Sequence, residues 1–208
     1  MLATKAIVAI NVAVYLFISL SVGGTNGRGS LSNDLALYGP AVHNGEWWRL
    51  VTSSVVHYSI LHILFNMLIL WQVGMILEPG AGKGRFTTLY LVSVLGGAAG
   101  ALALTPHAFT GGASGGVFGV AAAATLVMHR QGVRFWDTGF GPLLLINLAL
   151  CFFLPGISVG GHIGGLIAGT LAAEAMLQAR KAGQPALGYA GAGFVGAAAV
   201  LLAFAVAR

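Results

Sequence analysis

The chain has 208 residues, of which 57% are hydrophobic and only 7% charged, and its mean hydropathy is +0.88. Because a soluble domain carries about a quarter charged residues, this composition excludes a soluble globular protein. It predicts an all-helical protein that crosses the membrane several times. The net charge of +5 comes from single basic residues scattered between apolar runs, which excludes a nucleic-acid-binding patch. The only cysteine, Cys151, excludes an internal disulfide and argues against a metal cluster.

Seven apolar runs follow one another along the chain, and each has about the length of a transmembrane or buried helix. The first run follows Lys5 and has features of a signal peptide, but we interpret it as a retained helix. The second run is predicted to end at the stop signal Leu77-Glu78-Pro79-Gly80. The runs cover residues 6–22, 60–77, 86–104, 114–128, 140–154, 161–178 and 187–206.

The first loop, residues 23–59, is too long to be a simple turn. Trp47, Trp48 and Arg49 precede a stretch rich in leucine and valine, which is typical of an amphipathic segment with interfacial aromatic side chains. We therefore predict that this loop is partly helical and lies in the outer leaflet. An ordinary interfacial anchor is the alternative.

The distribution of basic residues predicts the orientation, because loops on the cytoplasmic side carry more lysine and arginine. With the N-terminus in the cytoplasm, seven of the ten basic residues lie inside and three lie outside. A seven-helix chain then has its C-terminus outside. The short tails are typical of a prokaryotic protein, so we expect a multi-pass protein of a prokaryotic inner membrane. The inner residues are Lys5, Lys83, Arg85, Arg130, Arg134, Arg180 and Lys181; the outer ones are Arg28, Arg49 and Arg208.

A glycine-rich turn at residues 111–116 carries one hydroxyl group, that of Ser114, and opens the fourth run. A helix from Ser114 to Met128 would be about 22 Å long at 1.5 Å per residue, against a hydrocarbon core of about 30 Å. Ser114 is therefore expected below the outer surface, where irregular backbone must be buried in protein or line a water-filled cavity. The backbone N–H groups at the N-terminus of this helix would stabilise an oxyanion that develops beside the Ser114 hydroxyl. The plainer interpretation is a small-residue helix start packed on another helix.

Three further polar side chains are expected at the depth of Ser114. His62 and Asn66 lie four residues apart on one face of the second run. His162 lies near the outer end of the sixth run, which crosses the membrane in the same direction as the fourth. We expect the fourth and sixth helices to pack with their backbones in contact, which would bring His162 towards Ser114. The small-residue pairs that predict this packing are Gly115 with Gly119 and Gly165 with Gly169.

Together these side chains supply the parts that acyl transfer requires. Ser114 is a nucleophile that needs a base, and His162 is the base that packing would bring to it. His62 and Asn66 offer hydrogen-bond donors to an oxyanion, beside the Ser114 backbone N–H. Since no acidic residue is expected at this depth, the sequence predicts a Ser–His dyad. Taken singly, each polar residue could instead form an ordinary hydrogen bond between helices.

These motifs make the chain resemble the rhomboid intramembrane serine proteases. The resemblance implies a six-helix core over residues 6–179, an extra C-terminal helix over 187–206, and a single membrane domain over 1–208. It implies hydrolysis of peptide bonds in or near transmembrane segments of other proteins, with no cofactor or metal and with the lipid bilayer as surroundings. It also implies that the fifth helix and the loop after it admit the substrate. The matching motifs are Trp48-Arg49, His57-x4-His62-x3-Asn66, Gly112-Ala113-Ser114-Gly115 and Gly161-His162 with Gly165 and Gly169.

The resemblance also assigns roles to residues. Ser114 and His162 are expected to be catalytic, with His62, Asn66 and Ser114 stabilising the oxyanion. Many rhomboids carry a tyrosine at the position of Phe118, stacked on the catalytic histidine; a phenyl ring can still stack there but has no hydroxyl. Supporting roles are expected for His57, Phe118, Gly112, Gly165, Gly169, Trp48 and Arg49.

Other functions fit the sequence less well. Residues 112–116 match the G-x-S-x-G nucleophile elbow, but the strand and soluble α/β sheet that this motif requires are not expected. The zinc-protease motif H-E-x-x-H does not occur, which argues against a zinc protease. A metal site formed by His57, His62 and His162 is a remaining alternative. A non-proteolytic rhomboid-like protein that binds membrane helices is the main alternative. A small transporter or channel is a further alternative, but the sequence shows no inverted repeat with paired half-helices that would favour it.

Overall fold

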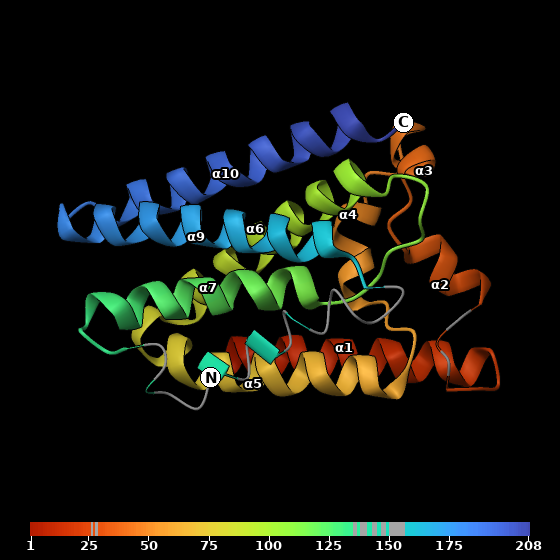
Figure 1. Cartoon of the computed structure of the whole chain (residues 1–208), viewed down its shortest axis with the longest axis horizontal. Helices are drawn as coiled ribbons and strands as arrows, with labels where there is room; N and C mark the ends of the chain where they lie inside the picture. Colours follow the sequence, from red (N-terminus) through yellow and green to blue (C-terminus); the bar gives the residue numbers. More distant parts are fainter. Residues whose placement is uncertain are drawn as a thin grey trace.

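The computed structural model describes residues 1–25, 27, 29–134, 137, 141–142, 145–146, 149 and 157–208. Six long helices lie within these residues and run roughly along one axis (Figure 1). The described residues form no strand, only an isolated bridge between Leu37 and Thr110, so the predicted all-helical class is confirmed. The predicted fifth run lies largely outside the described residues. The helices are α1 (Leu2–Ser21), α5 (Ile60–Ala81), α6 (Lys83–Leu104), α7 (Ser114–Arg130), α9 (Val159–Lys181) and α10 (Pro185–Val206).

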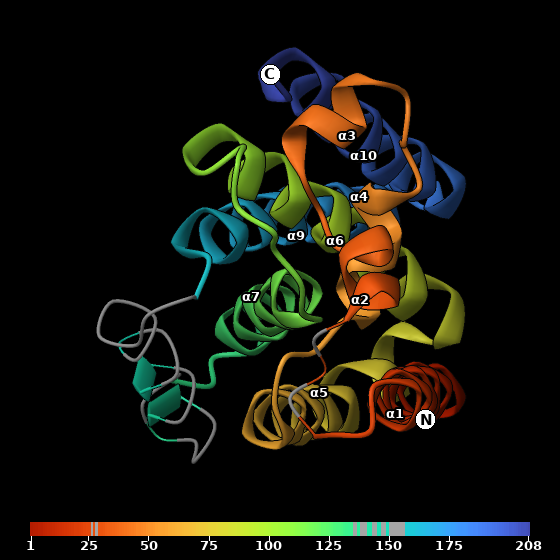
Figure 2. The same ribbon diagram turned by 90° about the vertical axis from the view of Figure 1, so that its right-hand side faces the viewer.

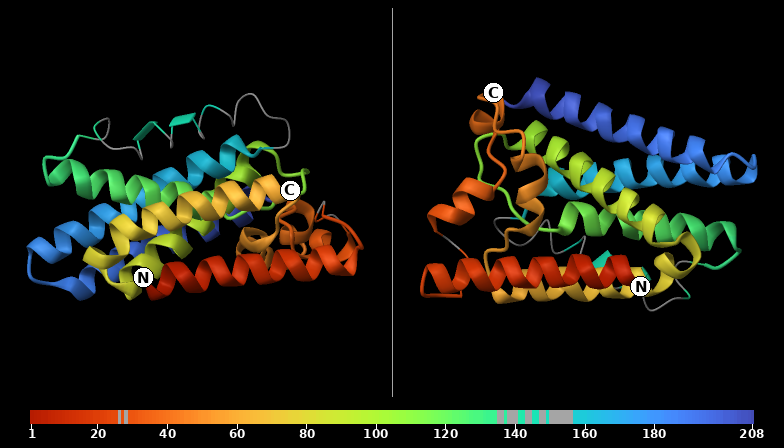
Figure 3. Two further views of the ribbon diagram at one scale, coloured as in Figure 1. Left: turned by 90° about the horizontal axis from the view of Figure 1, so that it is seen from below. Right: turned by 180° about the vertical axis from the view of Figure 1, so that it is seen from behind.

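Helix α7 occupies the centre of the bundle. Figure 2 shows it with α5 and α1 on one side and with α6, α9 and then α10 on the other. The views from below and behind in Figure 3 show the same order of helices. Four helices, α1, α5, α6 and α10, are long and apolar enough to span a membrane, whereas α7 has only 17 residues. The central helix is therefore short, as the sequence predicts, and its N-terminal residue Ser114 lies within the bundle.

Helices α7 and α9 touch through their backbones. A Cβ atom added at Gly165 would lie 2.1 Å from the carbonyl oxygen of Gly115, and one at Gly169 would lie 2.4 Å from that of Gly119. No side chain fits in such a gap, so these positions require glycine. The predicted pairing of the two small-residue motifs is confirmed by this contact.

Helix α6 makes an equally close contact with α9, which the sequence analysis did not predict. A Cβ atom at Gly100 would lie 2.2 Å from the Gly160 carbonyl oxygen, and one at Gly97 would lie 3.0 Å from Gly161 O. The Cβ atom added at Gly97 would also lie 3.0 Å from the Cα atom of Gly115. The three helices α6, α7 and α9 therefore meet at one dense point beside the start of α7.

The predicted end of the second helix is wrong by about one turn. Helix α5 continues through Pro79 to Ala81 and ends before Gly82, whose φ of +81° favours glycine. Proline weakens a helix by removing one hydrogen bond, but tertiary contacts hold this turn in place. The buried Glu78 carboxylate accepts hydrogen bonds from the backbone N–H groups of Ala3 and Thr4 at 2.9 Å. These bonds attach the N-terminal turn of α1 to the end of α5, where the negative charge also interacts favourably with the dipole of α1.

The first loop is partly helical, as predicted. Arg49 lies buried within it and donates hydrogen bonds to the carbonyl oxygens of Asn33 and Ala36, at 2.5 and 2.7 Å. Trp47 and Trp48 stay 63% and 41% exposed. The loop caps the end of the bundle that also holds the C-terminus (Figure 1). Its short helices are α2 (Ser30–Leu35), α3 (Gly39–His43), α4 (Arg49–Thr52) and the 3-10 turn η1 (Ser53–Val55).

Candidate active site

Ser114 is the first residue of α7, and the glycine before its N-cap shapes the turn. Gly112 has a φ of +137° and donates its N–H to the carbonyl oxygen of Ser53 at 2.9 Å. A Cβ atom at Gly112 would lie 2.8 Å from Nε2 of His62 and 3.7 Å from Oγ of Ser114. Both its backbone angle and its surroundings therefore favour glycine. The two distances also show that the Ser114 hydroxyl on α7 and the His62 imidazole on α5 both lie close to Gly112.

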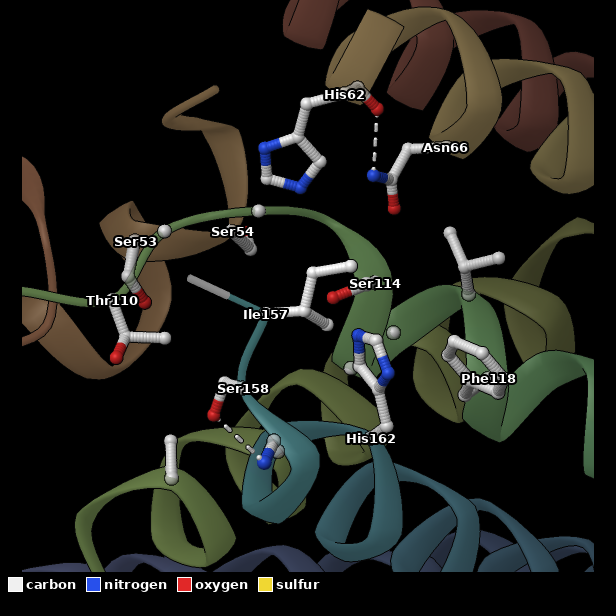
Figure 4. A pocket seen from close by; sticks show the side chains of 18 of the residues that line it. Ser53, Ser54, His62, Asn66, Thr110, Ser114, Phe118, Ile157, Ser158 and His162 are labelled. Carbon is white, nitrogen blue, oxygen red and sulfur yellow. Dashed lines mark hydrogen bonds between the residues drawn. The ribbon is translucent and has the colours of Figure 1, made fainter. Parts of the chain in front are cut away.

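His162 lies in the first turn of α9, which begins after Ser158. The Ser158 hydroxyl caps this helix by accepting a hydrogen bond from the Gly161 N–H at 3.1 Å. His162 is only 6% exposed, and its ring stacks on that of Phe118, with centroids 4.3 Å apart and planes 28° apart. Figure 4 shows the imidazole beside the Ser114 hydroxyl. Packing of α7 on α9 therefore brings the two residues together, with Phe118 behind the histidine.

His62 and Asn66 enter the site from α5. The Ser59 hydroxyl caps this helix by accepting the His62 N–H at 3.1 Å. The Asn66 amide donates one N–H to the His62 carbonyl oxygen at 2.9 Å, which leaves its second N–H for another acceptor. In Figure 4 both side chains lie across the cavity from His162. The four polar residues predicted to share one depth are thus brought to one place.

A cavity of about 520 Å³ lies between these side chains, and we call it the central cavity. Its volume is within the range of ligand-binding sites. Ser114, His162, His62 and Asn66 all line it, together with residues of the first loop, α5, α6 and α9. Among the described lining residues there is no carboxylate. Nor do the described His, Cys, Asp and Glu side chains gather in a group of three that could hold a metal ion.

Some predicted site residues lie outside the wall of the central cavity. Trp48 and Arg49 belong to the first loop, and Gly165 and Gly169 lie at the contact of α7 with α9. Sequence reasoning missed other polar groups in the wall, because isolated serines and threonines carry no spacing signal. These are Ser53, Ser54, Tyr58, Ser59, Thr110 and Ser158.

His57 is fully buried beneath the turn that carries Ser114. Its Nε2 accepts the Ala113 N–H at 3.4 Å, and its ring meets that of His62 edge-on, with centroids 4.9 Å apart. Burial, aided by the nearby His62, lowers the pKa of His57 to about 3. The imidazole is therefore neutral near pH 7, as an acceptor of an amide N–H must be.

The chain matches a known protein family over the residues that form the site. A family model described as "Rhomboid domain" matches residues 44–180, well over half of the chain and all of the site. The chain belongs to the rhomboid family. Rhomboid protease GluP of Bacillus subtilis is 34% identical over 181 residues, which cover 83% of this chain and 34% of that protein.

Two further relatives show the range of the family. Rhomboid protease GlpG of Enterobacter sp. is 34% identical over 154 residues, covering 69% of this chain and 54% of GlpG. Inactive rhomboid-related protein 2 of Caenorhabditis elegans is 36% identical over 141 residues, covering 62% of this chain and 40% of that protein. The rhomboid chain described here thus spans about a third of GluP and about half of GlpG. Family membership alone therefore does not decide between a protease and an inactive relative.

Proposed function

We propose that this rhomboid is an intramembrane serine endopeptidase that hydrolyses peptide bonds in or near transmembrane segments of other membrane proteins. The observation that carries the proposal is the position of the Ser114 hydroxyl beside the His162 imidazole, at a helix N-terminus that opens into the central cavity. A serine becomes a nucleophile when an adjacent base can take its proton. The absence of a carboxylate from the described cavity wall supports a Ser–His dyad.

The chemistry follows the order of acyl transfer. His162 takes the Ser114 hydroxyl proton as Ser114 Oγ attacks the scissile carbonyl carbon, and the carbonyl oxygen becomes an oxyanion. His162 then gives the proton to the departing amine as the C–N bond breaks, leaving an acyl-enzyme on Ser114. Water, deprotonated by His162, attacks the ester, and His162 returns the proton to the Ser114 oxygen. The carboxylic acid product then leaves, and no cofactor is consumed.

Three groups are proposed to hold the oxyanion. The Ser114 N–H lies at the start of α7, where the helix dipole favours negative charge. The His62 imidazole and the free N–H of Asn66 approach the cavity from α5. Such fixed donors stabilise charge that develops in the transition state without reorganisation of solvent. Phe118 is proposed to hold the His162 ring by stacking, and does not require a hydroxyl for this role.

The orientation proposed for the chain places the site towards the outer side of a prokaryotic inner membrane. Ser114 and His162 lie at the ends of α7 and α9 nearer the first loop (Figure 1). Basic residues lie at the opposite ends: Lys83 follows α5, Arg130 ends α7 and Lys181 ends α9. Because cytoplasmic loops are rich in basic residues, this separation supports a cytoplasmic N-terminus. Transmembrane proteins would then reach the cavity from the bilayer.

The alternative is a non-proteolytic rhomboid that binds membrane helices, and the similarity to an inactive relative motivates it. A fluorophosphonate probe, which reacts covalently with activated serines, separates the two functions. We expect the purified protein to be labelled at Ser114, as located by mass spectrometry, and labelling to be lost in His162→Ala. Exposed His107, changed to alanine, provides the control for loss of a histidine. Unlabelled Ser114 in a folded wild-type protein would favour the non-proteolytic alternative.

A further inference from the structure

A second groove lies between the start of α1 and the start of α6. Seen from behind, this part of α6 lies between α1 and α10 (Figure 3, right). The groove has a volume of about 430 Å³, and we call it the α6 groove. Among the described residues, it shares no lining residue with the central cavity, so it is a separate site. Its lining residues are Leu2, Ala3, Ala6, Lys83, Gly84, Thr87 and Thr88.

The wall that α1 contributes to the α6 groove is apolar and open to the surroundings. Leu2 is 65% exposed, and Ala6 is exposed four residues later on the same face of α1. The outer face of α6 continues beyond Thr88 with Leu91, which is 44% exposed. Both helices are apolar enough to span a membrane, so this exposed apolar surface meets lipid. An acyl chain can therefore lie along it.

The part of the α6 groove formed by α6 carries a positive charge that no acidic group neutralises. The exposed Lys83 ammonium has no carboxylate partner among the described residues. Glu78, the nearest acidic residue in the sequence, is already engaged by the N-terminal turn of α1. The Tyr189 hydroxyl reaches the same place from α10, because a Cβ atom added at Gly84 would lie 3.0 Å from it. A cation and a hydroxyl from two helices thus lie beside the apolar wall.

We propose that the α6 groove binds an anionic phospholipid, with its phosphate against Lys83 and an acyl chain along Leu2 and Ala6. A lysine ammonium binds phosphate as a point charge, and a tyrosine hydroxyl can donate to a phosphate oxygen. Basic residues near a membrane surface attract anionic lipids. The bound lipid would contact α1, α6 and α10 together, and so join the C-terminal helix to the start of the bundle. The groove lies apart from the proposed dyad, so lipid binding does not depend on proteolysis.

Two pairs of variants test the two halves of this site. Lys83→Gln removes the charge, and Lys181→Gln is its matched control, because Lys181 is an exposed lysine at the end of α9 and outside the groove. Ala6→Trp fills the apolar part, and Ala13→Trp is its control, because Ala13 is exposed about two turns further along α1.

The ligands are phosphatidylglycerol and phosphatidylcholine with identical acyl chains, added separately to the purified protein in detergent. Native mass spectrometry measures the apparent Kd of each lipid from the fraction of protein that carries it. The Tm is measured with and without each lipid, because a ligand that binds the folded state raises the Tm. Inorganic phosphate is added in a third arm, which separates a lipid site from a simple anion site.

We expect the wild type to bind phosphatidylglycerol more tightly than phosphatidylcholine and to gain Tm from it. Lys83→Gln should weaken phosphatidylglycerol binding by about fivefold, the effect of one lysine near an anionic lipid surface, and Lys181→Gln should not. Ala6→Trp should weaken the binding of both lipids, and Ala13→Trp of neither.

Three results would overturn the proposal. The first is equal affinity of the wild type for the two lipids. The second is an equal loss of phosphatidylglycerol binding in Lys83→Gln and Lys181→Gln, which would indicate attraction to the basic end of the bundle as a whole. The third is displacement of phosphatidylglycerol by millimolar inorganic phosphate, or its undiminished binding to Ala6→Trp, either of which would show that the apolar wall holds no acyl chain.

Discussion

Gly165 lies at the closest contact between the two helices that carry the proposed dyad. It follows His162 by less than one turn of α9, and it faces Gly115, the residue next to Ser114. A change at this contact therefore acts on the separation of nucleophile and base. Replacement by alanine is the smallest change that tests this link, because it adds a single methyl group.

The size of the effect follows from the geometry. The added Cβ would lie 2.1 Å from the carbonyl oxygen of Gly115, whereas ordinary van der Waals contact begins at 3.4 Å. The obstacle is backbone, so it cannot rotate away, and the helices must separate by roughly 1.3 Å. Separations of about 1 Å can lower a rate by about 10²-fold. Overpacking of this kind destabilises proteins by about 1–3 kcal/mol.

The assay measures kcat/KM for a transmembrane substrate together with Tm in the same detergent. We expect Gly165→Ala to lower both. Gly193→Ala on α10 is the matched control, because no atom lies within 4 Å of its added Cβ. This control should keep full activity, and its stability should be unchanged or slightly raised, as alanine favours helix over glycine by up to about 1 kcal/mol. If Gly165→Ala behaved like Gly193→Ala, the close contact of α7 with α9 would not set the geometry of the dyad.

Three further predictions concern the surroundings of the dyad. His62→Ala and Asn66→Ala should each lower kcat by up to about 10²–10³-fold; full activity of the double variant would exclude them as oxyanion donors. Phe118→Tyr should keep kcat/KM and Phe118→Ala should lower it, because only the former keeps a ring stacked on the base; an active alanine variant would exclude this role. Because His57 has a pKa of about 3 when folded against an ordinary 6.5, the unfolded chain binds more protons between these values. The free energy of unfolding should therefore fall as pH drops from about 6.5 towards 3, and less so in His57→Gln; identical pH dependence would contradict the buried neutral state.

The positions of the long helices could be predicted because each one is a long apolar run. The α7–α9 contact could also be predicted, since two G-x-x-x-G pairs occur on runs that cross in the same direction. The glycines of α6 were missed, because Gly96-Gly97 and Gly100 do not reveal which neighbour they face. The end of α5 was predicted about one turn too early because Pro79 is a typical helix stop signal. Hydrogen bonds between Glu78 and α1 instead stabilise the last turn, and the helix ends at Ala81.

The site could be predicted as a set of residues but not as a connected structure. His62, Asn66, Ser114 and His162 could be grouped by depth, since polar groups are rare in such apolar runs. The contribution of Ser53 could not be predicted, because this residue contacts the turn through its backbone carbonyl, which accepts the Gly112 N–H. Every residue has a backbone carbonyl, so the residue type does not indicate which carbonyl accepts a hydrogen bond.

The central claim is that Ser114 cleaves peptide bonds within or next to a membrane-spanning segment. Its most direct test is to reconstitute the purified protein in liposomes with a single-span substrate and to determine the product masses. We predict two product fragments whose masses place the cut in or beside the span, and none with Ser114→Ala at equal protein and matched Tm. Equal amounts of the same fragments from wild type and Ser114→Ala would contradict the account.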